Sequence, residues 1–119
     1  MKKRILVYDN QLGYYNLLKE SFKKGYTFIL FSNDYSVYGK NEDAIIFFLD
    51  DDIELIDLIK LYRDDIPFII GCSHADAHCL TGKENIYNVG LMQTKDKIIK
   101  QLGKILDNVS NNNLKEEAL

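Results

Sequence analysis

The sequence lacks the features of several special classes of protein. Its 119 residues include two cysteines, one proline and no tryptophan, and its longest uninterrupted apolar run, Ala44 to Leu49, is six residues long. A run of that length is far too short to cross a bilayer. With 46% apolar and 28% charged residues, the composition is that of an average globular chain, which excludes a disordered, collagen-like or disulfide-scaffold protein. A net charge of −3 argues against a nucleic-acid surface.

The amino terminus also lacks the pattern of a targeting signal. Met1 to Arg4 is basic, but the apolar stretch behind it ends at Tyr8 and is followed by polar residues, so neither a signal sequence nor a membrane anchor is expected. We therefore expect a cytoplasmic protein that makes no membrane contact. In the reducing cytosol, Cys72 and Cys79 are expected to be thiols.

Apolar runs and helical periods take turns along the chain. Each expected strand is a short apolar run, and each expected helix repeats apolar residues at a period of 3.6. The expected strands cover residues 4–8, 26–31, 44–49, 68–70 and 86–91. This alternation predicts an α/β domain with a parallel, doubly wound sheet and helices on both faces, because right-handed crossovers lay each helix against the sheet.

The expected helices differ in the strength of their patterns. The first covers residues 11–24, and a short or poorly formed second helix is expected between residues 35 and 43. The apolar face of the third comprises Leu55, Ile56, Ile59 and Tyr62. The last has Thr94 as its N-cap. Its apolar face comprises Ile98, Ile99, Leu102, Ile105 and Leu106. We expect one domain over residues 1–109, with a tail or the start of a linker over residues 110–119.

Two carboxylates follow strands that are candidates for neighbours in the sheet. Asp9 follows the first strand and Asp50 the third. Ligands of such sheets collect beyond the carboxyl ends of the strands, which makes these side chains the first candidates for a site. Facing carboxylates are costly unless a cation lies between them, and Mg²⁺ takes one or two carboxylates while keeping positions for water or phosphate oxygens. An aspartate there is also a candidate to accept a phosphoryl group, whereas no P-loop or dinucleotide fingerprint is present.

Over residues 3 to about 109, the chain resembles the receiver domains of two-component response regulators. The likeness lies in the five-fold alternation of strands and helices, in the segments Ile5 to Asn10 and Ile66 to Ile70, and in the last amphipathic helix. The resemblance implies a flavodoxin-like sheet of strand order 2-1-3-4-5. It also implies an acidic pocket of Asp9, Asn10 and Asp50, in which Asp9 and Asp50 are the candidate ligands of Mg²⁺.

Three places of the family's pattern are altered or ambiguous in this chain. Asn10 stands where the family has a second acidic residue. The place of the phosphoacceptor falls at Asp50 or at Leu49, depending on the register. Cys72, with Ser73 next to it, stands at the place of a serine or threonine that switches with the phosphate.

The place of the family's lysine is the most informative departure. With Thr94 as the cap of the last helix, this place is Leu91, and Lys95 takes it only if the helix begins later. The lysine and the hydroxyl of a receiver read a new phosphate by donating to its oxygens, and leucine has no donor. The resemblance therefore indicates a degenerate receiver that regulates without phosphotransfer.

The expected function is that of a non-enzymatic regulatory domain in bacterial two-component signalling. Through conformation or dimerisation it would act on a protein partner or on an attached output domain that controls transcription. The last helix is the candidate dimer surface, and a histidine kinase is a further candidate partner. One alternative is a working Mg²⁺-dependent phosphoacceptor in a phosphorelay, with Asp50 as acceptor and Lys95 or Ser73 supplying the missing contacts.

Two other clusters leave alternatives open. Asp51 or Asp52 is a candidate helix cap, because Glu54 stands at the spacing of a capping box and negative charge favours a helix start. The segment from Cys72 to Cys79 contains both cysteines and both histidines of the chain. Thiolate and imidazole are ligands of zinc, so a metal or redox sensor built on this loop is the second alternative.

Overall fold

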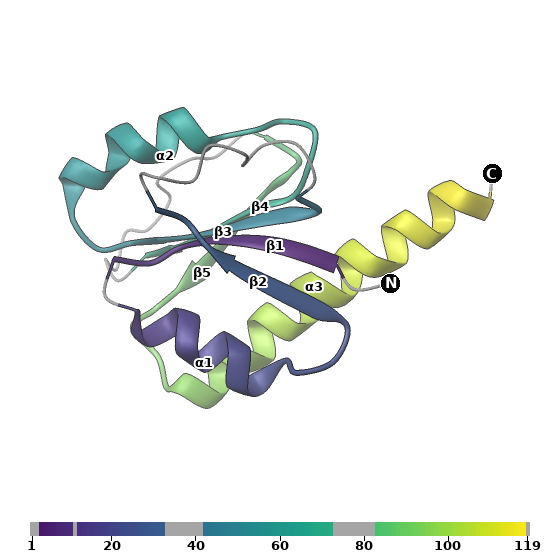
Figure 1. Ribbon diagram of the computed structural model, residues 1–119, viewed down its shortest axis with the longest axis horizontal. Helices are drawn as coiled ribbons and strands as arrows, with labels where there is room; N and C mark the ends of the chain where they lie inside the picture. The colour runs from purple at the N-terminus through teal and green to yellow at the C-terminus, as the bar shows by residue number, and fades with distance from the viewer. Residues whose placement is uncertain (1–2, 11, 33–41, 73–82, 119) are drawn as a thin grey trace.

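The structure of the chain is a computed structural model that describes residues 3–10, 12–32, 42–72 and 83–118. Five parallel strands form one sheet of order β2-β1-β3-β4-β5 (Figure 1). The strands are β1 (Lys3–Tyr8), β2 (Tyr26–Leu30), β3 (Ala44–Leu49), β4 (Phe68–Cys72) and β5 (Ile86–Gly90). The prediction of an α/β fold with a five-stranded parallel sheet is confirmed. The helix expected between residues 35 and 43 falls almost entirely outside the described residues.

The helices lie on opposite sides of this sheet. Figure 1 shows α1 (Gly13–Ser21) and α3 (Lys95–Ala118) on one side and α2 (Leu55–Leu61) on the other. A 3-10 turn, η1 (Asp52–Glu54), leads directly into α2. Among the described residues, no helix is both long enough and apolar enough to span a bilayer.

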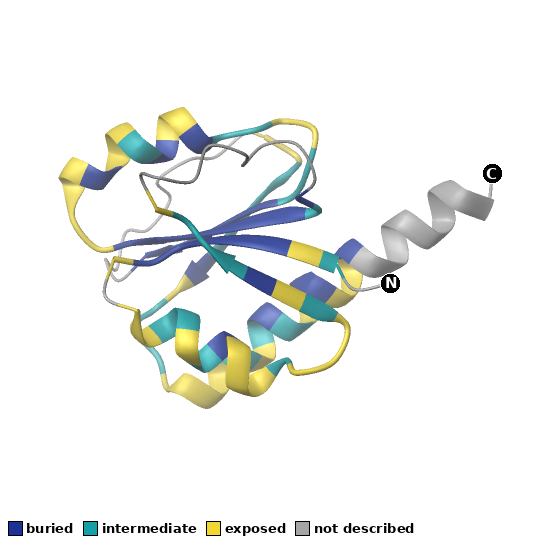
Figure 2. Ribbon diagram, viewed as in Figure 1, coloured by how far each residue is buried: buried dark blue, intermediate teal, exposed yellow. Residues whose placement is uncertain are grey.

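Two layers of buried side chains hold the helices to the sheet. Successive side chains of a strand point to opposite faces, so Ile46 and Phe48 of β3 pack on the side of α1 and α3, whereas Phe47 and Leu49 pack on the side of α2. All residues of β3 are buried, and the central strands form a dark band in Figure 2. This explains why the sequence of β3 is apolar throughout, as is usual for a strand covered on both faces.

The start of α3 agrees with the sequence, but its end does not. The Thr94 hydroxyl accepts a hydrogen bond from the Lys97 backbone N–H at 3.3 Å, which confirms Thr94 as the N-cap. The helix continues to Ala118, whereas the apolar period of the sequence predicts a helix that ends near Leu106. Extending a helix costs much less than starting one, so α3 can pass through its asparagines into residues 114–118, most of which favour helix.

α2 presents a different face to the sheet from the one predicted. Leu58 and Leu61 are buried in the core, whereas Ile56 and Ile59 are 59% and 72% exposed. The prediction that Ile56 and Ile59 belong to the core-facing side of this helix is therefore wrong. Apolar residues occur on both sides of α2, so its period fits two orientations, and the burial of Glu54 at its start favours the one observed.

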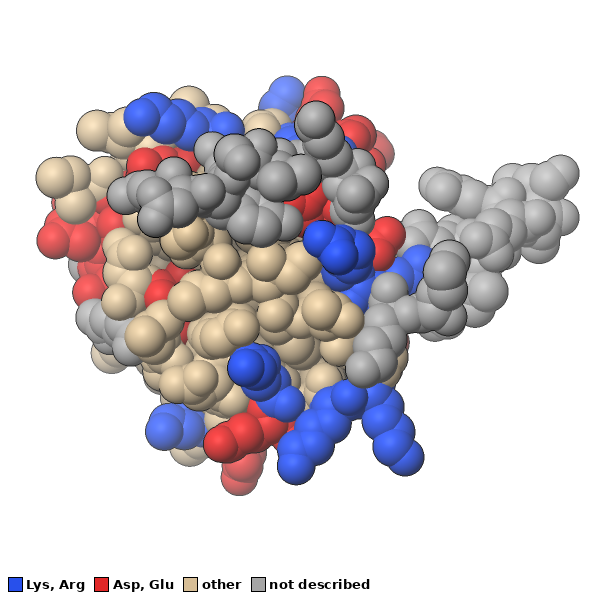
Figure 3. Space-filling view, viewed as in Figure 1, with Lys and Arg blue, Asp and Glu red and all other residues tan. Residues whose placement is uncertain are grey.

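The charges of the described chain are unevenly distributed. In Figure 3, blue lysine and arginine side chains gather around α1, while red acidic side chains dominate the left edge, where α2 begins. Three aspartates, Asp50 to Asp52, are exposed at that edge.

Candidate functional site

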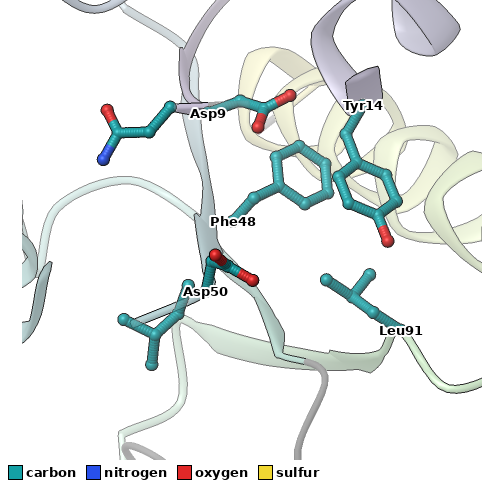
Figure 4. A pocket seen from close by; sticks show the side chains of 7 residues that line it. Asp9, Tyr14, Phe48, Asp50 and Leu91 are labelled. Atoms are coloured by element: carbon teal, nitrogen blue, oxygen red, sulfur yellow. The ribbon is translucent and has the colours of Figure 1, made fainter. Parts of the chain in front are cut away.

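A small pocket opens beyond the carboxyl ends of β1 and β3, on the side of the sheet covered by α1 and α3 (Figure 4). Its volume is about 60 Å³, which leaves room for a small ion or a few water molecules. The lining residues are Asp9, Asn10, Tyr14, Phe48, Leu49, Asp50 and Leu91. The structure thus brings both candidate carboxylates to one site together with Asn10 and Leu91.

Asp9 also has a structural role, because it caps α1. Its carboxylate accepts a hydrogen bond from the Tyr15 backbone N–H at 2.9 Å, and its carbonyl oxygen accepts one from the Leu12 N–H at 3.3 Å. Leu12 itself gives the helix no side-chain cap and has a left-handed φ of 65°, which costs a leucine roughly 1–2 kcal/mol. Asp9, only 6% exposed, therefore supplies both the acceptor and the negative charge that stabilise the start of α1.

Asp50 is the carboxylate that reaches the pocket from β3. Leu49 is paired with Cys72 and buried among apolar side chains on the α2 side of the sheet. Asp50, the next residue, is exposed and lies opposite Asp9 across the pocket (Figure 4). Of the two positions that the sequence left open, Asp50 is the one that brings a carboxylate into the pocket.

Asn10 is bound on the side of the pocket that faces α2. Its side-chain amide donates to the Tyr8 hydroxyl at 3.2 Å and to the carboxylate of Glu54. Glu54 is 4% exposed and also accepts from the backbone N–H groups of Asp50 at 2.7 Å and of Asp51 at 2.8 Å. An acidic residue in place of Asn10 would face this buried carboxylate, an unfavourable pair of like charges. The neutral amide at position 10 and the buried Glu54 are therefore complementary.

The same glutamate completes a capping box. Asp51 is the N-cap of η1, its side chain accepts from the Ile53 backbone N–H at 3.5 Å, and Glu54 accepts from the backbone of Asp51. The predicted capping role is confirmed for Asp51. Asp52 is instead the first residue inside the turn, and it is exposed.

The opposite wall of the pocket is apolar. The ring of Tyr14 stacks on that of Phe48, with centroids 4.6 Å apart and planes at 11°. A Cβ atom added to Gly71 would lie 2.9 Å from Phe48 Cδ1 and 3.2 Å from Leu91 Cδ2, so these side chains close over the glycine. Burial, followed by the charges of the two pocket carboxylates, raises the pKa of Tyr14. Its hydroxyl therefore stays protonated at neutral pH.

Leu91, and not Lys95, accompanies the two carboxylates. Leu91 follows β5, and its backbone N–H donates to the Cys72 carbonyl oxygen at 2.9 Å. Because Thr94 caps α3, the helix does not begin later, and Lys95 is exposed as its first residue. Lys95 does not line the pocket.

Cys72, the last residue of β4 and the first of the two predicted switch positions, does not line the pocket. Cys72 is 2% exposed and packs on the α2 side of the sheet, opposite the pocket wall formed by Phe48. Ser73 and the remainder of the segment to Cys79 lie outside the described residues, and so does the metal or redox site considered for that segment.

The pocket combines two carboxylates with a mostly apolar wall. Its carboxylates are those of Asp9 and Asp50, and Mg²⁺ generally binds one or two carboxylates of a protein with its other positions left to water. In the described part of the chain, no group of three or more histidine, cysteine, aspartate or glutamate side chains suits a metal ion. A phosphoryl group would meet Leu91 and Phe48, whose side chains donate no hydrogen bond, and Tyr14, whose protonated hydroxyl is a donor.

Tyr8 connects this site to α2. Its hydroxyl donates to the Asp57 carboxylate at 2.7 Å and accepts from Asn10, and its ring stacks on Phe47 with centroids 4.0 Å apart. Burial and then the hydrogen bond to Asp57 raise the pKa of Tyr8 to about 12. The folded chain therefore holds the Tyr8 hydroxyl in its protonated form at neutral pH, as the donor of the hydrogen bond to Asp57.

The pKa of Tyr8 predicts a loss of stability at alkaline pH. An unfolded chain releases a tyrosine proton near pH 10, whereas folded Tyr8 keeps it to about pH 12. Between these values the folded state binds more protons, so the free energy of unfolding falls as pH rises, and below about pH 10 Tyr8 contributes no pH dependence. Urea unfolding on both sides of pH 10 should give a flatter profile for Tyr8→Phe than for the wild type. Equal slopes would contradict the prediction.

The sequence did not identify three residues as part of the site. Tyr14 belonged to the periodic face of a helix, Phe48 to an apolar run, and Glu54 to a capping box. One signal was available for Phe48, because it precedes Asp50 by two residues and side chains alternate along a strand.

Compared with known proteins, the chain matches no protein-family model and no curated protein.

Proposed function

We propose that the chain is a receiver-like regulatory domain with a flavodoxin-like sheet that acts in the cytoplasm without phosphotransfer. Strand order and helix placement support the fold assignment, since β1 lies between β2 and β3 as in other doubly wound sheets of this type. In this proposal the domain is not an enzyme. It belongs to two-component signalling and acts by conformation or dimerisation on a protein partner or on a transcription-regulating output domain.

The observation that carries the proposal is the position of Leu91 beside Asp9 and Asp50. A phosphate on Asp50 would add negative charge and acceptor oxygens that need donors to change the structure. Leu91 offers none, the Asn10 amide is already bound to Glu54, and the Tyr14 hydroxyl belongs to α1. A modification of Asp50 would therefore gain no new contact at the start of α3.

The alternative is a working phosphoacceptor, favoured by the exposed carboxylate of Asp50 opposite Asp9. In that case Asp9 and Asp50 would hold Mg²⁺, which when bound offsets negative charge at the acceptor oxygens. A histidine kinase would then be the partner. The side of α3 that carries Lys97, Lys100 and Lys104 is exposed, so this helix is accessible for homodimerisation in either candidate function.

The two candidates differ in their response to acetyl phosphate and beryllofluoride. We expect no gain of mass in wild-type protein incubated with acetyl phosphate and Mg²⁺, and no shift of backbone amide resonances around Leu91 on adding beryllofluoride and Mg²⁺. A phosphoryl mass gain that Asp50→Ala abolishes, together with shifts around Leu91, would establish the phosphoacceptor instead.

A lysine variant tests the role of Leu91 directly. Leu91→Lys places an amine beside the two carboxylates, and we expect this variant to gain the beryllofluoride response that the wild type lacks. Met92→Lys is the matched control, because Met92 is 76% exposed and does not line the pocket. A wild type that responds as strongly as Leu91→Lys would overturn the proposal.

A further inference from the structure

The outer side of α2 carries most of the large apolar side chains that the described structure leaves exposed. Four of these six side chains occur within seven residues, at Ile53, Leu55, Ile56 and Ile59, which we call the α2 patch. Residues three and four apart share one side of a helix, so these side chains lie together, and Figure 2 shows the outer surface of α2 as exposed. Single exposed apolar residues are ordinary, whereas several exposed side by side are a common feature of docking surfaces.

The α2 patch is held in its outward orientation. At the start of the helix, buried Glu54 is bound to the Asn10 amide and to two backbone N–H groups of the preceding loop. One turn later, Asp57 accepts from the Tyr8 hydroxyl at 2.7 Å. Rotating α2 to bury Ile56 and Ile59 would break these bonds and expose Leu58, which is fully buried. The exposure of the patch is therefore built into the packing of the helix.

The surroundings of the patch are acidic. Five aspartates are exposed before and after the helix, whereas Glu54 is buried and Asp57 is bound to the Tyr8 hydroxyl; the exposed ones are Asp50, Asp51, Asp52, Asp64 and Asp65. One of the two cations of residues 50–65, Arg63, is paired with Asp65 at 2.6 Å and with Glu42 at 3.7 Å. The other cation, Lys60, is exposed on α2 itself, so a ligand there meets isoleucine and leucine side chains flanked by more carboxylates than cations.

We propose that the α2 patch docks a basic amphipathic helix of another protein. The apolar stripe of such a helix would cover the isoleucines, and its lysine or arginine side chains would face the carboxylates, an arrangement that also accelerates encounter. A second copy of the chain is disfavoured, since a two-fold contact would bring two acidic surfaces together. Anionic lipid is disfavoured for the same reason. The proposal depends on α2 and not on the pocket, so it can fail without the proposed function failing.

A pair of synthetic peptides tests the two parts of this recognition. The probe is a leucine–lysine peptide of about 18 residues with leucines at helical spacing, long enough to form an isolated helix. The first comparison peptide has the same composition in an order without an apolar face, and the second replaces lysine with glutamate. In fluorescence anisotropy on the full chain, we expect the patterned leucine–lysine peptide to bind at least tenfold more tightly than either.

Variants of the patch locate the binding. Ile56→Gln combined with Ile59→Gln should weaken binding of the patterned peptide at least tenfold, without loss of folding because both side chains are exposed. Met92→Gln, at an exposed apolar residue elsewhere, should leave it unchanged. Equal binding by the glutamine double variant, or by the peptide without an apolar face, would overturn the proposal. Wild-type self-association in sedimentation that the double variant abolishes would identify a second copy as the occupant and overturn it as well.

Discussion

Replacing Glu54 with alanine is expected to lower the free energy of unfolding by about 2–4 kcal/mol. The buried carboxylate accepts from the backbone N–H groups of Asp50 and Asp51 and from the Asn10 amide. Hydrogen bonds to a charged group are among the stronger ones in proteins, and the donors left behind lose their partner in a partly buried site. Urea unfolding followed by circular dichroism measures the loss.

Two further variants separate the contacts of Glu54 from the effect of removing a charge in this loop. Asp52→Ala removes an exposed carboxylate from the same turn and should change the free energy of unfolding by less than about 0.5 kcal/mol. Glu54→Gln keeps the size of the side chain and an acceptor oxygen, so its cost should fall between the two. If Glu54→Ala proved no more destabilising than Asp52→Ala, Glu54 would not be the anchor of α2.

Replacing Gly71 with alanine is expected to cost about 1–3 kcal/mol, as overpacking of a buried site does. The new Cβ would lie 2.9 Å from Phe48 Cδ1, closer than such atoms approach in folded proteins. Phe48 cannot yield easily, because Tyr14 stacks on its ring at 4.6 Å. Thermal and urea unfolding should both show the loss.

Gly90 provides a matched control for this substitution. It is paired with Cys72 in the neighbouring strand, and a Cβ built on it has no atom within 4 Å. Gly90→Ala should therefore be neutral or stabilise by up to about 1 kcal/mol, because alanine reduces the freedom of the unfolded chain. Adding Leu91→Ala to Gly71→Ala should not relieve the clash with Phe48, since the 2.9 Å contact is with the Phe48 ring. Equal effects of Gly71→Ala and Gly90→Ala would refute the close packing.

The strands could be predicted from the sequence because the signal is local. β3 occupies residues 44–49, the apolar run itself, and Thr94 and Asp51 act as the caps that their spacing indicated. The orientation of α2 was not predictable in this way. Five of its seven residues are apolar, so the choice between two faces depended on Asn10, which lies more than forty residues away in the chain.

The pocket was predictable only in part, for a similar reason. Parallel strands bring their carboxyl ends to one edge, so Asp9 and Asp50 were expected to share a site. The apolar wall was not expected, because the contact of Phe48 with Gly71 depends on the pairing of β3 with β4 and that with Tyr14 on the packing of α1. Cys72 stands at the sequence position predicted for a switch residue, but its side chain packs on the α2 side of the sheet and not on the side of the pocket.

The hydrogen bond between Asn10 and Glu54 has a thermodynamic consequence, because it joins the loop after β1 to the helix that carries the exposed isoleucines. Any ligand that draws the Asn10 amide into the pocket must break this bond and so loosen the first turn of α2. By linkage, a partner that binds only the intact turn and a ligand that needs the released Asn10 amide weaken each other's binding affinity by the same factor. The pocket and the α2 patch would thereby exclude each other's occupants through the loop that joins them.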